Sequence, residues 1–122
     1  MGPYSQAVKA GAFLFVSGQL AIDPKEGRIV ADNIKGQTSR VLNNIQAILG
    51  AAGYGFEDVV QTNVYLSSMT LFKEFNAEYA GYFGKGFPAR ATVGAELPQG
   101  ALVEISAVAY KEGNIRPLIS RT

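Results

Sequence analysis

Two residue types that carry much of enzyme chemistry, cysteine and histidine, are absent from the sequence. Without cysteine there can be no disulfide bond, no thiolate nucleophile and no cysteine-bound metal. Without histidine there can be no Ser-His-Asp triad and no imidazole-bound zinc, and the commonest general base is missing. An enzyme with this composition must therefore use carboxylates, arginine, tyrosine, hydroxyl groups and backbone groups.

Charge is also sparse. Only 17% of the 122 residues are charged, against 48% that are hydrophobic, and the formal net charge is +1. A chain of this length predicts one domain with a real core. The small net charge provides no field to attract nucleic acid or a membrane. So few charges also suggest that part of the surface is buried against another subunit.

Long hydrophobic runs are the third absence. The N-terminal segment has no basic stretch followed by an apolar core, so no signal peptide is predicted. No run approaches the roughly 20 apolar residues that span a bilayer. We therefore expect a cytoplasmic protein with no membrane partner.

The pattern of what is present predicts strands and two helices in the order β-β-β-α-β-α-β-β. The first helix is expected to be capped by Asp32 or Asn33 and to stop at Gly53, and the second to run from Thr70 to Gly84. An aromatic stripe on the second helix favours a core position over a base-stacking surface, because no basic residue is interleaved with it. The predicted strands are residues 13–16, 20–22, 28–30, 61–66, 91–93 and 102–110.

The final strand, 102–110, is largely apolar on both faces. Two helices can cover only one face of a sheet. The second face then needs another cover, and neighbouring copies of the same chain supply one, so we expect a homo-oligomer. The predicted domain covers residues 1–112, and residues 113–122 form a C-terminal tail.

Arg90 and Glu104 are lone charges within apolar β segments. Burying either without a partner would be costly, so each should be paired or face a cleft. Arginine presents a planar fork of donors that suits a carboxylate, and glutamate can act as a general base. They could equally pair only with each other as a structural salt bridge, and the residue pattern does not choose between these readings.

Two further polar residues, Tyr4 and Ser17, lie close to glycines in the sequence. Tyr4 is a phenol in a loop constrained by glycine and proline, and its simplest interpretation is a packed aromatic ring with a hydrated hydroxyl. Ser17 lies where a strand ends beside Gly18. Because the chain has no histidine, Ser17 can offer no more than a hydrogen bond to a ligand or to the backbone.

Four segments together resemble the RidA/YjgF/YER057c/UK114 family: Gly2-Pro3-Tyr4-Ser5-Gln6-Ala7, Val16-Ser17-Gly18-Gln19, Phe87-Pro88-Ala89-Arg90-Ala91 and Val103-Glu104-Ile105-Ser106-Ala107-Val108-Ala109. The resemblance spans residues 2–110, with the motifs in the family's order. It implies an α+β, chorismate-mutase-like fold of the bacillus type, with two helices on one face of the sheet. It also implies a homotrimer built around the other face, with active sites in the clefts between subunits.

The resemblance further implies a reaction, the hydrolysis of reactive enamines and imines to 2-keto acids and ammonia. Such 2-iminobutanoate/2-iminopropanoate deaminases need no cofactor and no metal, because the imine is already electrophilic. Carried over by motif, Arg90 would bind the substrate carboxylate, Glu104 would activate water, and the backbone carbonyl of Thr92 would help to hold it. Tyr4, Ser17 and Asn76 would line the pocket. Many members carry cysteine in place of Thr92, which a backbone role tolerates.

Two other functions compete with the deaminase. Some relatives are assigned endoribonuclease or translation-inhibitor activity, but single-stranded RNA calls for a basic groove with stacking aromatics. A non-catalytic sensor of small carboxylates would need Arg90 and not Glu104. The presence of Arg90 favours the deaminase, which acts on small 2-imino or 2-enamino acids.

Overall fold

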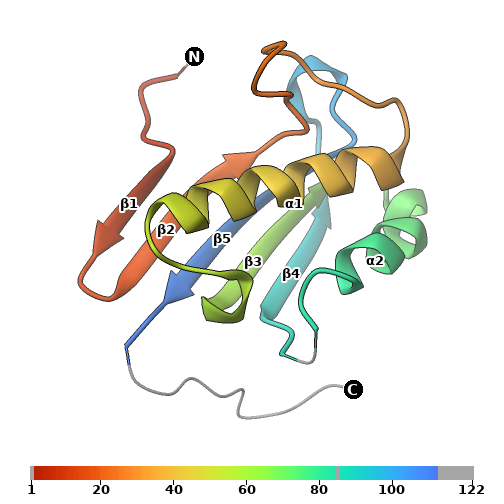
Figure 1. The fold of residues 1–122 in the computed structure, drawn as a ribbon. Helices are drawn as coiled ribbons and strands as arrows, with labels where there is room; N and C mark the ends of the chain where they lie inside the picture. Colours follow the sequence, from red (N-terminus) through yellow and green to blue (C-terminus); the bar gives the residue numbers. More distant parts are fainter. Residues whose placement is uncertain (1, 85, 113–122) are drawn as a thin grey trace.

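The computed structural model describes residues 2–84 and 86–112, and these form one five-stranded sheet with helices on a single face (Figure 1). The strand order is β1-β2-β5-β3-β4, and every pairing is antiparallel except that of β3 with β4, which is parallel. The strands are β1 (Ala7–Ala10), β2 (Phe13–Gln19), β3 (Val59–Leu66), β4 (Ala89–Gly94) and β5 (Val103–Tyr110). The α+β class and the one-sided helices predicted from the sequence are confirmed.

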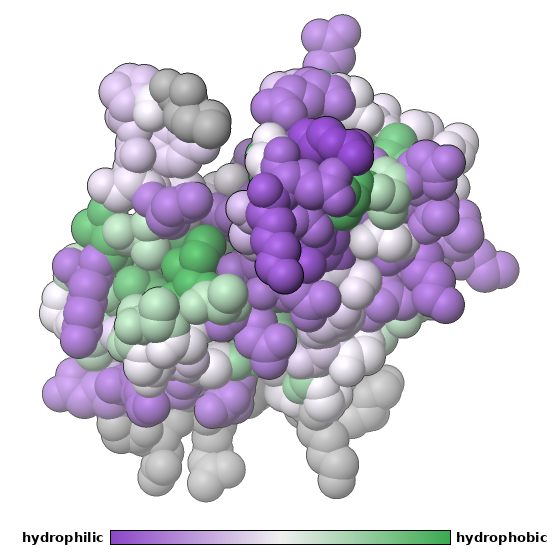
Figure 2. Space-filling view, turned by 45° about the horizontal axis from the view of Figure 1, so that its top comes forward, coloured by the Kyte–Doolittle hydropathy of each residue, from purple (hydrophilic) through white to green (hydrophobic). Residues whose placement is uncertain are grey.

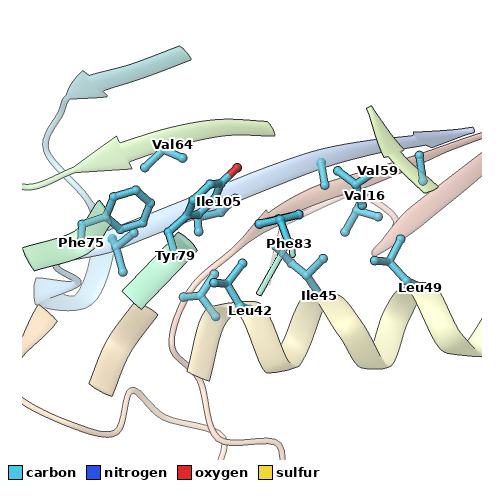
Figure 3. Close-up of a cluster of buried hydrophobic side chains, with 14 of the residues drawn as sticks. Val16, Leu42, Ile45, Leu49, Val59, Val64, Phe75, Tyr79, Phe83 and Ile105 are labelled. Carbon is cyan, nitrogen blue, oxygen red and sulfur yellow. The ribbon is translucent and has the colours of Figure 1, made fainter. Parts of the chain in front are cut away.

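Strand β5 occupies the centre of the sheet between β2 and β3. Its residues alternate strictly between buried and half-buried, as a strand with two different faces requires. Its buried side chains meet those of helix α1 (Ile34–Ala51) and helix α2 (Phe72–Ala80), which lie against the same face (Figure 3). One continuous core therefore sits between the helices and the sheet.

Helix α1 begins and ends where the sequence predicts. The Asn33 side chain accepts a hydrogen bond from the Gly36 amide at 2.7 Å, so Asn33 rather than Asp32 is the N-cap. Gly53, just past the helix, has φ of +85°, the left-handed conformation that glycine adopts most easily. Gly36 lies so close to Ala31 that a Cβ would stand 2.8 Å from the Ala31 methyl, which explains a glycine in the first turn.

Helix α2 is shorter than predicted. A 3-10 turn, η2 (Met69–Leu71), precedes it, and the Ser68 hydroxyl rather than Thr70 caps that turn. The helix ends at Ala80, before Gly84. The aromatic stripe was correctly placed in the core, since Phe75 and Tyr79 are both buried.

Two predicted strands are absent from the sheet, and one real strand was missed. Residues 20–22 and 28–30 flank the turn at 23–27, and a single isolated bridge between Ile22 and Ile29 joins them. Segments of three residues are too short to show a period, so the sequence pattern could not distinguish strands of the sheet from the flanks of a turn. Strand β1 pairs with β2 along its whole length but was not predicted, because four residues are too few to show a period.

The face of the sheet opposite the helices has no cover from the described residues. Four large apolar side chains are exposed there, those of Val8 on β1, Phe13 and Phe15 on β2, and Val93 on β4. Half-buried Tyr65, Val108 and Tyr110 continue the same surface across the sheet. We call this surface the open face.

No helix within residues 2–84 and 86–112 combines the length and the apolar character needed to cross a membrane. The predicted tail, residues 113–122, lies outside the described residues, so the predicted domain boundary at residue 112 stays a prediction.

Candidate active site

The predicted site residues fall into two separate groups in the chain. Tyr4, Ser17 and Glu104 line a cavity of about 780 Å³ at the end of the sheet near the N-terminus. Arg90 and Asn76 line a second cavity of about 600 Å³ between α2 and β4. Figure 2 turns the molecule by 45° so that the top of Figure 1 comes forward, and it shows hydrophobic surface beside more hydrophilic parts. We call the first group the Glu104 half-site and the second group the Arg90 half-site.

Strand register explains why the groups are separate. Thr62 on β3 is opposite Arg90 on β4, whereas Tyr65 on β3 is opposite Glu104 on β5. Opposite residues in neighbouring strands share a face, and positions 62 and 65 differ by an odd number, so they point to different faces. Arg90 is therefore on the helix-covered face and Glu104 on the open face. The predicted alternative of a salt bridge between them is wrong for a single chain.

The Arg90 guanidinium lies over three aromatic rings of α2. Its central carbon is 5.6 Å from the ring centroids of Phe72 and Phe75 and 5.0 Å from that of Tyr79. Within the described part of the chain, the only ion pair joins Arg28 to Glu26 at the surface, so no carboxylate neutralises Arg90. A guanidinium that packs against aromatic rings and has no carboxylate partner among the described residues is suited to bind an anionic ligand.

Asn76, on α2, lines the same cavity as Arg90. Thr92 does not line this cavity, but it lies two residues beyond Arg90 on the same face of β4. The Asn76 Oδ1 and Thr92 Oγ1 atoms are buried and have no hydrogen-bond partner among the described residues. Buried polar atoms without partners are uncommon, and a ligand or water is one way to satisfy them.

Glu104 projects from the centre of the sheet and packs over Gly18. A Cβ on Gly18 would overlap the Glu104 carboxylate, so glycine is needed for the carboxylate to lie there. Burial raises the pKa of the Glu104 carboxyl above its ordinary value of 4.5, because the charged form is poorly solvated. A carboxylate with a raised pKa is a stronger base than an ordinary one.

Ser17 contacts the backbone in this chain, one of the two roles open to it from the sequence. Its hydroxyl donates to the Ser5 carbonyl at 2.6 Å, and its amide donates to the Gln6 carbonyl at 2.9 Å. These bonds hold the segment that carries Tyr4, whose side chain is 62% exposed. Ser17 therefore fixes the wall of the cavity near Tyr4.

Gln19 is a functional candidate that the sequence analysis did not single out. Its side chain is 8% exposed, and its amide nitrogen donates to Gln6 Oε1 at 2.9 Å and to the Ser17 carbonyl at 3.1 Å. The signal was available, since Gln19 ends the Val-Ser-Gly-Gln motif and is a polar residue in a strand that is otherwise apolar on its inner face. With Gln6 and Ser17 it forms what we call the N-terminal latch.

Within residues 2–84 and 86–112, no three carboxylates lie close enough together to hold a metal ion. The chemistry available to the two half-sites is anion binding at Arg90 and proton transfer at Glu104.

A family model described as Endoribonuclease L-PSP matches residues 1–111. The chain belongs to this family. Solved structures named for YjgF and RidA share its fold, which identifies it as the RidA/YjgF family resembled by the sequence motifs. The predicted family is confirmed.

Three members illustrate the likeness. The RutC family protein PH0854 of Pyrococcus horikoshii is 56% identical over 113 residues, which cover 92% of this chain and 90% of that protein. The YjgF gene product of E. coli is 36% identical with a TM-score of 0.86, covering 92% of this chain and 91% of its own. RidA from an Antarctic Psychrobacter is 40% identical with a TM-score of 0.87, covering 90% and 89%.

Proposed function

We propose that this RidA/YjgF protein is an imine deaminase that hydrolyses 2-imino acids and their enamine tautomers to 2-keto acids and ammonia. The observation that carries the proposal is the Arg90 guanidinium, which lies on three aromatic rings beside an unsatisfied Asn76 and has no acidic partner in the described chain. An arginine in this setting binds a small carboxylate with two parallel hydrogen bonds. Every 2-imino acid carries such a carboxylate.

The active site joins Arg90 of one copy to Glu104 of another. The two residues lie on opposite faces of one sheet, so a reaction that uses both cannot be completed within a single chain. The open face supplies the apolar surface on which copies associate, and a homotrimer around this face closes the assembly. Each cleft between subunits then contains one half-site of each kind.

The reaction proceeds in two stages in this cleft. Arg90 holds the substrate carboxylate while Glu104 takes a proton from water, whose oxygen attacks the imine carbon. The backbone carbonyl of Thr92 accepts a hydrogen bond from the same water and orients it. Glu104 returns this proton to the nitrogen, which gives a carbinolamine. Glu104 then transfers the carbinolamine hydroxyl proton to the nitrogen as the carbon–nitrogen bond breaks, so ammonia and the 2-keto acid are released and Glu104 is ionised again.

The remaining predicted residues shape the pocket. Asn76 presents its unsatisfied oxygen beside Arg90, and it accepts a hydrogen bond from the imine or from water. Tyr4 and Ser17 line the Glu104 cavity, Tyr4 with an exposed phenol and Ser17 through the backbone it supports. The chemistry is complete with these side chains and water, and it requires no cofactor.

The decisive experiment generates 2-aminoacrylate with a dehydratase and follows release of pyruvate. The protein should accelerate release, and Arg90→Ala should lose most of this acceleration because the carboxylate loses its anchor. Arg90→Lys keeps the charge without the fork, so it should retain only part of the activity. Equal rates of pyruvate release for the unmodified protein and the Arg90→Ala variant would refute the deaminase proposal.

The Glu104→Gln variant distinguishes an enzyme from a non-catalytic sensor of small carboxylates. Retained binding of pyruvate with turnover lost would support the general-base role, whereas unchanged turnover would exclude it.

The family description names an endoribonuclease, so the same variants should be assayed on single-stranded RNA. RNA cleavage that depends on Glu104, with no imine hydrolysis, would favour that activity instead.

A further inference from the structure

Tyr79 connects the Arg90 half-site to the core of the sheet. Its ring lies 5.0 Å from the Arg90 guanidinium carbon, and its hydroxyl hydrogen-bonds with the Thr62 hydroxyl at 2.7 Å. Thr62 is the residue directly opposite Arg90 in the β3–β4 ladder. Figure 3 shows Phe75 and Tyr79 extending from α2 toward the strands. One ring thus spans the gap between helix and sheet beside Arg90.

The hydrogen bond between Tyr79 and Thr62 is fully enclosed. Tyr79 is 3% exposed and Thr62 is 1% exposed, so neither hydroxyl has access to bulk water. Breaking the bond from either side leaves a buried hydroxyl without a partner, which is more costly than the bond is worth when both partners are present. The ring therefore has one favoured position, fixed at its hydroxyl end by the sheet.

Ring position matters because arginine has a long side chain with many rotamers. Phe72, Phe75 and Tyr79 recur at helical spacing on one face of α2, and the guanidinium lies over all three. Attraction between a guanidinium and aromatic faces favours a limited set of orientations for the charged plane. A fork already oriented loses less conformational freedom when it binds a carboxylate.

We propose that Tyr79, fixed by Thr62, is a positioning residue that orients the Arg90 guanidinium for carboxylate binding. The inference rests on the proposed function and adds to it a residue that acts through Arg90. It assigns the Tyr79 hydroxyl a role in substrate affinity, although that hydroxyl faces the sheet and not the substrate.

The test compares Tyr79→Phe, Thr62→Val and the double variant. Each single variant breaks the same bond and should raise KM for 2-aminoacrylate and Kd for pyruvate by about threefold, with kcat little changed. The double variant should show the same increase and not the product of two, because only one bond is lost. Tyr79→Leu removes a ring from beneath Arg90 and should raise KM about tenfold.

Phe83→Leu is the matched control. Phe83 packs on Tyr79 with ring centroids 4.7 Å apart and is buried, but it makes no contact with Arg90 of the kind seen for the other rings. It should lower thermal stability while leaving KM unchanged. If the Tyr79 variants changed only stability, as Phe83→Leu does, the positioning role would be overturned.

The Arg90 side chain also provides a direct signal. In a ¹H–¹⁵N spectrum, ring currents should displace the Arg90 Nε–H resonance from the position of an exposed arginine, and Tyr79→Leu should move it back. Activity that depends on Arg90 but is indifferent to Tyr79, with this signal unmoved, would refute the inference and leave the deaminase intact. Activity indifferent to Arg90 would refute the deaminase itself.

Discussion

Glu104 and Gly18 form a pair in which the small residue makes room for the functional one. Gly18 follows Ser17 where the β2–β5 register shifts, and its missing side chain leaves the space that the Glu104 carboxylate fills. The φ angle at Gly18 is not in the left-handed region, so the backbone itself would accept alanine. The requirement for glycine here is therefore steric.

Gly18→Ala should separate stability from activity. The Glu104 carboxylate is the end of a flexible side chain and can move aside, so we expect a stability change within about 1 kcal/mol. The displaced carboxylate would no longer hold water correctly, and kcat should fall at least about tenfold. Gly50→Ala on α1 is the control, since a Cβ there meets nothing within 4 Å. Full activity in Gly18→Ala would contradict the assigned position of Glu104.

The raised pKa of Glu104 predicts the acid limb of the pH–rate profile. A general base must be ionised, so kcat/KM should fall as pH drops through the pKa of the Glu104 carboxyl. Because burial raises that pKa, the fall should be centred above the ordinary value of 4.5. Residual activity in Glu104→Gln should lack this limb. A limb that persists in Glu104→Gln would assign the titration to another group.

At the scale of elements, the N-terminal latch joins β1 and the Tyr4 segment to β2. Among the described strands, β1 is an edge strand that pairs with β2 alone, so the hydrogen bonds of Gln6, Ser17 and Gln19 add to a short ladder. Hydrogen bonds of this kind contribute about 0.5–1.5 kcal/mol each. The latch thereby keeps the Tyr4 wall of the cavity near Glu104.

Gln19→Leu tests the latch. Removing the amide should increase hydrogen exchange at residues 4–10 and raise KM several-fold, while kcat changes less because Glu104 stays in place. Gln46→Leu, on the exposed side of α1, is the control for replacing a glutamine by leucine. Unchanged exchange at residues 4–10 in Gln19→Leu would show that β1 pairing alone holds the segment.

The sequence predicted those helices and strands whose patterns extend over many residues. Strand β5 is an eight-residue, largely apolar β segment and α1 has both a cap and a glycine stop, so both were recognised. Arg90 and Glu104 could be singled out as lone charges, but the face that each occupies depends on strand register. Register is set by contacts between distant segments, which local periodicity does not contain.

At the scale of the whole molecule, the separation of the two half-sites and the exposed open face both call for association of copies. Arg90 is on one face of the sheet and Glu104 is on the other. The face that carries Glu104 is the open face, which exposes large apolar side chains. Exposed apolar surface of this kind is typical of a protein interface. Association of copies would bury this surface and complete the proposed active site in the same step.

Mixing two inactive variants tests the composite site. Arg90→Ala retains the Glu104 half-site, and Glu104→Gln retains the Arg90 half-site. After unfolding and refolding together in equal amounts, roughly a quarter of the clefts in a closed ring should receive both native residues. Activity should return to about that fraction, whereas separately refolded variants, combined afterwards without exchange, should stay inactive. No recovery in the co-refolded sample would place both residues of each site in the same chain.

The central position of β5 also governs how the chain can fold during synthesis. The last strand to leave the ribosome is inserted between β2 and β3, which were made long before it. Until residues 103–110 emerge, β2 and β3 each have an open edge and the two parts of the sheet cannot join. The sheet therefore cannot be completed before β5 has been synthesised, and a chain truncated before residue 103 would contain two parts of a sheet that cannot join and are prone to aggregation.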